Sequence, residues 1–237
     1  GITPTITIPC LIDAQADRRF NSNESYGLKL VCKFLNSMKA NFKIFHPHNQ
    51  EVVEALIDNV EFIDNSEFIK EVILDIEGSG YNNFSFYKCR LENTLILFSS
   101  DAGGFKPLMK LSDKLDWKGD TFSASKSRKY EDGKSKLIQE VNKNDFEGRD
   151  ILIIDDICVF GGTFKGLANI LKNKNCGNLY LAISHLAVEN LGEDPVTNYF
   201  TKVYATDSKG LEHFAVGKGH DKIGYIPENL KIFNLFL

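Results

Sequence analysis

Residues 151–163 read ILIIDDICVFGGT, and this stretch indicates the fold of the chain. Four aliphatic residues in a row are typical of a strand that is buried on both faces, as in a parallel sheet. Asp155 and Asp156 follow at the carboxyl end of this strand, where open α/β sheets bind their ligands. Gly161 and Gly162 then open a predicted helix, whose first backbone amides can bind an anion. The stretch therefore predicts an α/β protein with a site for a ligand that carries hydroxyl and phosphate groups.

The same stretch resembles the phosphoribosyl-diphosphate motif that type I phosphoribosyltransferases share with ribose-phosphate diphosphokinases. That motif has aliphatic residues, Asp-Asp, two variable residues and then Asp-Thr-Gly-Gly-Thr. The acids, the glycines and Thr163 match it, whereas Val159 and Phe160 stand where the families have Asp and Thr. A chance Asp-Asp pair before a helix is the alternative, but chance does not explain why strand, acids, glycines and helix follow in the required order.

Length and composition restrict the class of protein. The 237 residues suffice for one large domain or two small ones, and 43% hydrophobic with 25% charged residues is ordinary for a globular protein. A net charge of −4 gives no basic footprint for nucleic acid, and no apolar run approaches a membrane span. The chain begins at Gly1 without a signal-peptide pattern, so we expect a cytoplasmic protein. Five cysteines without metal-ligand spacing predict reduced thiols.

Strand and helix patterns alternate along the chain, which predicts mostly parallel sheets with right-handed crossovers. The segment 230–237 is apolar and is expected to pair or pack at a sheet edge. The sequence texture changes around 86–94, so we expect two packed parallel-sheet α/β halves, 1–88 and 89–237. The resemblance implies type I phosphoribosyltransferase-like topology for them. Strands are predicted at 5–8, 42–45, 94–98, 121–125, 178–184 and 202–205. A helix is predicted to follow the N-cap residues 21–25 and to run to about 38, and further helices are predicted at about 51–57, 67–76, 105–115 and 163–171.

A second predicted strand ends in an acid and two glycines, in the segment 99–106, which reads SSDAGGFK. This segment is similar to the Pro-Asp-Ala-Gly-Gly segment of ribose-phosphate diphosphokinases, which ordinary phosphoribosyltransferases lack. The resemblance implies that Asp101 helps to hold the metal–ATP complex. A plain turn between a strand and a helix is the alternative.

Two cations, Lys126 and Arg128, lie two residues apart on a segment that we expect to be extended, so their side chains point the same way. They resemble the Lys-x-Arg of the diphosphokinase flexible loop, which implies a catalytic role in neutralising phosphate charge during transfer. The alternative is a solvated basic stretch, because Lys129, Lys134 and Lys136 follow.

The strand predicted at 42–45 runs into a loop that contains two histidines. His48 aligns with a diphosphokinase histidine that helps to bind metal–ATP, and His46 takes the place of an aspartate. The resemblance implies contacts of His48 with both ATP and the metal. A loop histidine without a ligand is the alternative.

An upstream segment is similar to the Ala-Arg-Gln-Asp-Arg-Lys nucleotide segment of the diphosphokinases. The resemblance implies ATP contacts for Asp17, Arg18 and Arg19, with the arginines on phosphate. Gln15 and Ala16 replace two residues that contact ATP in that family, which indicates a remodelled adenine site or weaker ATP binding. A surface pair of arginines is the alternative.

These segments follow one another in the diphosphokinase order over about residues 5–208. The resemblance implies Mg²⁺-dependent transfer of the β,γ-diphosphoryl group of ATP to the 1-hydroxyl of a 5-phosphorylated ribose, which gives a ribose 1-diphosphate and AMP. Asp155 and Asp156 would position the ribose hydroxyls, and Asp155 would also contact Mg²⁺. Gly161, Gly162 and Thr163 would bind the 5-phosphate. The resemblance also implies a homo-oligomer, either a dimer or a hexamer, and an additional N-terminal α/β stretch that the given sequence lacks.

The acceptor and the reaction class stay open at this point. Phe160 could pack beside a larger group on the 5-phosphate, so the acceptor is either ribose 5-phosphate or ADP-ribose, as in phage-type ADP-ribose pyrophosphate synthetases. A phosphoribosyltransferase that consumes phosphoribosyl diphosphate would use the same acids and glycines, but it has no need of Asp101 or the Lys126–Arg128 pair. A non-catalytic regulatory homologue would explain the departures at Gln15, Ala16, Val159 and Phe160.

Overall fold

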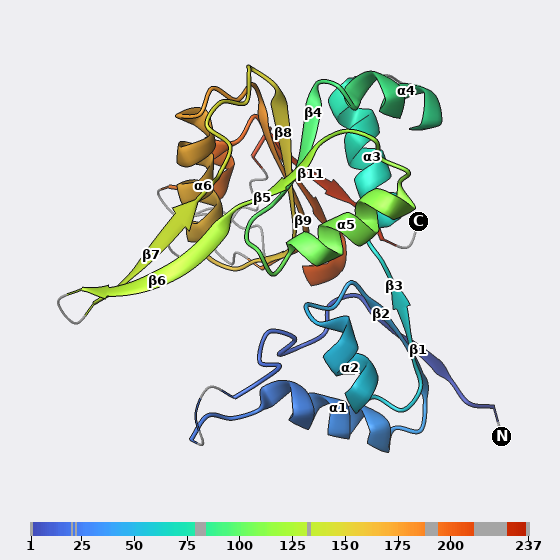
Figure 1. The fold of residues 1–237 in the computed structure, drawn as a ribbon. Coiled ribbons are helices and arrows are strands. Elements are labelled where there is room, and N and C mark those ends of the chain that lie inside the picture. Colours follow the sequence, from blue (N-terminus) through green and yellow to red (C-terminus); the bar gives the residue numbers. More distant parts are fainter. Residues whose placement is uncertain are drawn as a thin grey trace, which may run out of the picture. The chain divides into compact units, whose positions relative to one another are not determined.

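The computed structural model describes residues 2–19, 21, 23–78, 84–131, 134–187, 194–210 and 227–235 (Figure 1). The contacts divide the chain into two compact units, Gly1–Asn65 and Ser66–Leu237. The division therefore falls after residue 65, whereas the change in sequence texture pointed to residue 88. The helices Ser66–Glu77 and Phe84–Leu91 begin between these two positions and belong to the second unit.

The first unit contains a parallel three-stranded sheet in the order β1-β2-β3. Its strands are β1 (Thr5–Ile8), β2 (Asn41–Phe45) and β3 (Val60–Ile63), and its helices are α1 (Gly27–Ser37) and α2 (Gln50–Leu56). Leu28, Cys32 and Leu35 recur at helical spacing on α1 and share one core with Phe42 and Ile44 of β2. The core therefore joins the helix to the sheet. The strand β3 is a structural finding, since the sequence pattern over its four residues did not predict it.

The second unit contains a parallel six-stranded sheet in the order β11-β10-β9-β8-β4-β5. The prediction of an α/β fold with parallel sheets is confirmed, and the apolar segment near the carboxyl end does pair at a sheet edge, as β11 beside β10. The strands are β4 (Leu95–Ser99), β5 (Thr121–Ser123), β8 (Asp150–Cys158), β9 (Leu179–Leu186), β10 (Lys202–Thr206) and β11 (Leu230–Phe233).

Helices cover both faces of this sheet, so the aliphatic residues 151–154 of β8 are buried on both faces. Ile151 and Ile153 belong to the core with α6 (Gly162–Lys172), while Leu152 and Ile154 belong to the core with α3 (Ser66–Glu77) and α5 (Phe105–Lys114). Successive residues of a strand point to opposite faces, so a central strand with two covered faces must be apolar throughout.

A hairpin and a further helix complete the second unit. The antiparallel strands β6 (Ser125–Glu131) and β7 (Lys134–Glu140) form a two-stranded ribbon that extends beyond the sheet (Figure 1). The sequence predicted only an extended basic stretch there. The helix α4 (Phe84–Leu91) and the short helices η1 (Val196–Tyr199) and η2 (Asp207–Lys209) were not predicted. Over the described residues, no helix has both the length and the apolar character that crossing a membrane requires.

Asp75 ties α3 to the edge of the sheet. Its carboxylate accepts hydrogen bonds from Lys202 Nζ at 2.7 Å, Lys231 Nζ at 2.6 Å and Tyr204 Oη at 2.9 Å. Burial alone would raise the pKa of Asp75, but these three donors outweigh it and hold the pKa at about 2. The charged contact therefore stabilises the attachment of α3 to β10 and β11.

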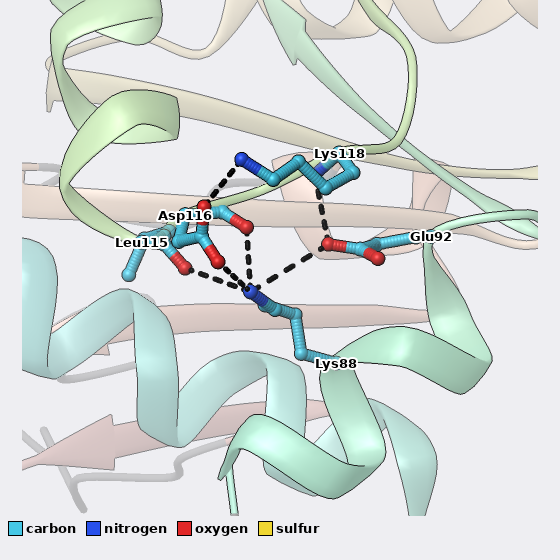
Figure 2. A network of polar contacts seen from close by, with 5 residues as sticks. All are labelled: Lys88, Glu92, Leu115, Asp116 and Lys118. Atoms are coloured by element: carbon cyan, nitrogen blue, oxygen red, sulfur yellow. Dashed lines mark hydrogen bonds and ion pairs between the residues drawn. The ribbon is translucent and has the colours of Figure 1, made fainter.

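Lys88 of α4 caps the carboxyl end of α5 (Figure 2). Its Nζ donates to Asp116 O at 2.5 Å, to Asp116 Oδ2 at 3.1 Å and to Leu115 O at 3.4 Å. Glu92 lies 3.8 Å from the same nitrogen and accepts from the Lys118 backbone N–H at 2.8 Å. A cation at the end of a helix satisfies carbonyls that have no partner inside the helix. Lys88 therefore fixes α4 and α5 to each other.

Candidate active site

Asp155 and Asp156 lie at a step in the sheet. On one side, β8 pairs with β9 as far as Cys158, so both acids lie within the strand. On the other side, its pairing with β4 ends at Ile154, opposite Ser99. The acids thus begin where β4 stops, at the carboxyl edge at which α/β sheets bind ligands.

Asp155 is held by two donors from the protein. Ser100 Oγ donates to its Oδ2, and the backbone N–H of Asp156 donates to its Oδ1 at 2.8 Å. Burial raises the pKa of Asp155 well above its ordinary value, and the neighbouring Asp156 raises it further, while the hydrogen bonds oppose these effects. A buried carboxylate beside a second acid is typical of a position that receives a cation or a hydroxyl-rich ligand.

The turn between β8 and α6 requires its first glycine. Gly161 has φ of +73°, in the left-handed region that L-residues avoid, and a Cβ there would lie 3.0 Å from Val196 Cβ. A Cβ at Gly162, by contrast, would meet nothing within 4 Å, so the space at the start of α6 is open. The first amides of this eleven-residue helix border that space, which suits a phosphate group.

The hairpin brings a cation to this turn. Lys126 Nζ of β6 donates to Thr163 Oγ1 of α6 at 3.3 Å, across 37 positions of sequence. The backbone of Arg128 lies two residues further along the same strand, in register with Leu137, but its side chain lies outside the described residues. The structure therefore joins Lys126 to the predicted phosphate site.

Asp101 lies in a tight turn at the end of β4. Its side chain accepts from the backbone N–H of Gly104 at 3.1 Å, and its carbonyl accepts from Ser99 Oγ at 2.8 Å. A Cβ at Gly104 would lie 2.5 Å from Ser99 Oγ, so this position has little room for a larger residue. The turn places Asp101 one residue after Ser100, whose hydroxyl contacts Asp155.

Phe160 occupies the turn after β8, and 90% of its surface is exposed. Such exposure of a large aromatic residue means that the core does not account for it. The ring lies next to Gly161 in sequence, at the edge of the predicted phosphate site.

The predicted nucleotide residues belong to the first unit. Asn49 Nδ2 donates to Asp17 Oδ2 at 2.8 Å, and Asn49 also caps α2 by accepting from Val52 N at 3.2 Å. Asn49 therefore ties the segment of Asp17 to the loop that carries His48. Arg18 and Arg19 are exposed, and Arg18 Nε lies 3.8 Å from Asp17 Oδ1. These residues and the acids of β8 belong to different units, and the structure describes each unit by itself.

Metal binding requires few protein ligands at a site of this kind. Within the described part of the chain, no three His, Cys, Asp or Glu side chains are grouped to hold a metal ion. Mg²⁺ is usually held by one or two carboxylates together with waters and substrate phosphates. The carboxylate oxygens of Asp101 and those of Asp155 are hard donors, and either acid could hold a Mg²⁺ ion of that kind. Two residues that contact predicted site residues had no role in the sequence prediction: Ser100, which donates to Asp155, and Asn49, which donates to Asp17.

Comparison with known proteins adds a family and distant relatives. The phosphoribosyl transferase domain model matches residues 83–221. The ribose-phosphate pyrophosphokinase of Aquifex aeolicus is 33% identical over 133 residues, which cover 54% of this chain and 40% of that protein. The one from Pyrococcus abyssi is 22% identical over 180 residues, which cover 76% of this chain and 56% of that protein. The chain thus spans about half the length of these relatives.

A solved structure shares the fold. The phosphoribosylpyrophosphate synthetase of Mycobacterium smegmatis superimposes with a TM-score of 0.68 and 17% identity, over 98% of this chain and 67% of that protein. At this identity the likeness concerns the fold alone, and it agrees with the parallel sheets described above.

Proposed function

Because the chain belongs to the phosphoribosyl transferase domain family, we propose that it transfers the β,γ-diphosphoryl group of ATP to the 1-hydroxyl of a 5-phosphorylated ribose. The observation that carries this proposal is the convergence of three segments at one edge of the sheet. Ser100 links the Asp101 turn to Asp155, and Lys126 reaches Thr163. Binding a ribose phosphate needs only the acids and the glycine turn. A cation at the same place suits the transfer of a highly charged group.

The acceptor would be held by β8 and α6. The carboxylates of Asp155 and Asp156 accept hydrogen bonds from ribose hydroxyls, which fixes the sugar ring. The amides at Gly161 and Gly162 and the hydroxyl of Thr163 bind the 5-phosphate. Such fixation turns a reaction between two substrates into one between oriented neighbours, which is a large part of catalysis in this class.

Each unit contributes residues that we propose for contact with the donor ATP. Lys126 and Arg128 offset the charge that grows on the phosphate oxygens while the 1-hydroxyl attacks the β-phosphorus. In the second unit, Asp101 would hold Mg²⁺ with ATP, and Mg²⁺ would supply further neutralisation of the diphosphoryl oxygens. In the first unit, His48 is the residue that we propose for contact with ATP and its metal. The exposed Arg18 and Arg19, beside Asp17, would contact the nucleotide.

The acceptor could carry a substituent on its 5-phosphate. Phe160 replaces a threonine of the family motif and exposes 90% of its surface, so its ring is available to stack on a base. ADP-ribose presents an adenine attached through its diphosphate, and we propose it as an acceptor beside ribose 5-phosphate. AMP release measured with each acceptor in turn decides between them. AMP from ribose 5-phosphate but none from ADP-ribose would reject the larger acceptor.

The test of the reaction is the formation of AMP from ATP, Mg²⁺ and acceptor by the purified full chain. We expect Lys126→Ala to lower kcat by about 10²–10³-fold, as for the loss of one group that stabilises transition-state charge. Lys110→Ala, which removes an exposed lysine on α5, is the matched control and should leave the rate unchanged. Equal rates for the two variants would remove Lys126 from the mechanism.

Two other outcomes identify the competing functions. Consumption of phosphoribosyl diphosphate with a nucleobase, without AMP formation from ATP, would identify a phosphoribosyltransferase. Binding of ATP and ribose 5-phosphate without any turnover would identify a non-catalytic homologue.

A further inference from the structure

Ser100 lies directly across the sheet from Asp155. The strands β4 and β8 are parallel, and their register pairs Ser99 with Ile154. Ser100 is the first residue after β4 and Asp155 is the first residue of β8 beyond this pairing, and the two side chains are joined by a hydrogen bond. Ser100 is only 3% exposed, so its hydroxyl has little access to water and must find its partner inside the protein.

The carboxylate of Asp155 is oriented by donors on both oxygens. Ser100 Oγ donates to Oδ2, while the backbone N–H of Asp156 donates to Oδ1 at 2.8 Å. One donor alone would leave the carboxylate able to rotate about its Cβ–Cγ bond. Two donors fix its plane, and only the donor from Ser100 can be removed by substitution.

Ser100 is itself fixed by the turn that follows it. On one side Ser99 Oγ donates to Asp101 O at 2.8 Å, and on the other the backbone N–H of Gly104 donates to Asp101 Oδ1 at 3.1 Å. Ser100 thus belongs to the turn of Asp101 and contacts the acid of β8. It physically links the part of the site proposed for metal–ATP to the part proposed for the sugar.

We propose that Ser100 is a positioning residue for the acceptor, which fixes the carboxylate of Asp155 in the orientation that receives the ribose hydroxyls. This inference rests on the proposed function, because it assumes that Asp155 contacts the sugar. It assigns to Ser100 an effect on acceptor binding that is transmitted only through Asp155.

The test is steady-state AMP formation by the full chain, with acceptor and ATP varied separately. For Ser100→Ala we expect KM for the acceptor to rise by about 10- to 100-fold, as for the loss of a hydrogen bond to a charged group. KM for ATP should change less than about 2-fold. Ser100→Thr keeps the hydroxyl and should restore most of the affinity. Ser112→Ala removes another buried serine hydroxyl, on α5, and should leave both constants unchanged.

A double-mutant cycle separates transmission through Asp155 from a general structural effect. In an Asp155→Asn background, adding Ser100→Ala should change KM for the acceptor by less than about 2-fold. Equal increases in both KM values, a full effect of Ser100→Ala in the Asp155→Asn background, or no rescue by threonine would each overturn the inference.

A wild-type chain that forms no AMP would reject the proposed function rather than the role of Ser100. Crystal structures of the wild-type and Ser100→Ala chains then decide. A rotated Asp155 carboxylate in the variant supports the positioning role, and an unchanged carboxylate overturns it.

Discussion

Replacement of Asp75 by asparagine should lower the free energy of unfolding of the second unit, because it weakens three contacts of the Asp75 carboxylate. The donors Lys202, Lys231 and Tyr204 hold the pKa of Asp75 at about 2, compared with an ordinary value of 3.8. This pKa difference of about 1.8, at about 1.36 kcal/mol per unit, corresponds to about 2.4 kcal/mol. Because 19% of the side chain is exposed, water screens the ion pairs, and we expect a loss of about 1–2 kcal/mol at pH 7.

The same contact predicts how stability depends on pH. The pKa of Asp75 is lower in the folded than in the unfolded chain, so its contribution is complete above about pH 4 and is lost as the pH falls toward 2. The Asp75→Asn chain should lack this part of the acid sensitivity. The wild type and the variant should therefore differ most at pH 7 and converge near pH 2.

Urea denaturation followed by tryptophan fluorescence measures this difference. Trp117 is the single tryptophan, is 5% exposed and lies in the same core as α3, so its emission reports on the second unit. Asp113→Asn, which replaces an exposed acid on α5, is the control and should unfold like the wild type. If Asp75→Asn unfolds with the wild-type free energy at pH 7, the three contacts do not stabilise the attachment of α3.

Three further predictions concern the turn, the helix cap and the exposed aromatic. Gly161→Ala should lower the free energy of unfolding by about 1–2 kcal/mol for the left-handed conformation alone, and by more because of the contact with Val196, which urea unfolding measures. The same variant should bind ribose 5-phosphate more weakly in calorimetric titration, and wild-type affinity would contradict the account of the turn. Lys88→Met should destabilise the second unit by about 1–3 kcal/mol, since the carbonyls of Leu115 and Asp116 lose their donor; an unchanged urea midpoint would show that water replaces the lysine. Phe160→Ala should change the free energy of unfolding by less than about 0.5 kcal/mol because the ring is exposed. The variant should raise KM for ADP-ribose and leave KM for ribose 5-phosphate unchanged, and a parallel rise in both KM values would exclude a base-stacking role.

The parts of the fold that the sequence predicted are those with a strong local pattern. The aliphatic run before Asp155 predicted β8, and the glycines after it predicted the start of α6, because burial on two faces and a left-handed turn each restrict the residue types allowed. The four residues of β3 are too few to show a period. Helix α4 reads FSFYKCRL and lacks a clear apolar face, so only its packing in the second unit makes it a helix.

The candidate site was predicted less completely because its contacts join distant segments. The sequence indicated Asp101, Asp155 and Lys126 as separate signals. The hydrogen bond from Ser100 to Asp155 spans 55 positions and depends on the register of two strands, which no local pattern reveals. The basic stretch after Ala124 became a hairpin only through the pairing of β6 with β7.

The step in the sheet at Asp155 also affects what mutagenesis can detect. Over the described residues, pairing of β8 with β4 ends at Ile154, four positions before its pairing with β9 ends at Cys158. On the side that faces β4, the peptide groups of residues 155–158 therefore lie outside the ladder between β8 and β4. A substitution changes a side chain but leaves the peptide group in place. An alanine scan would therefore underestimate the contribution of residues 155–158 to ligand binding. Backbone amide-to-ester replacement at these positions is the perturbation that would measure it.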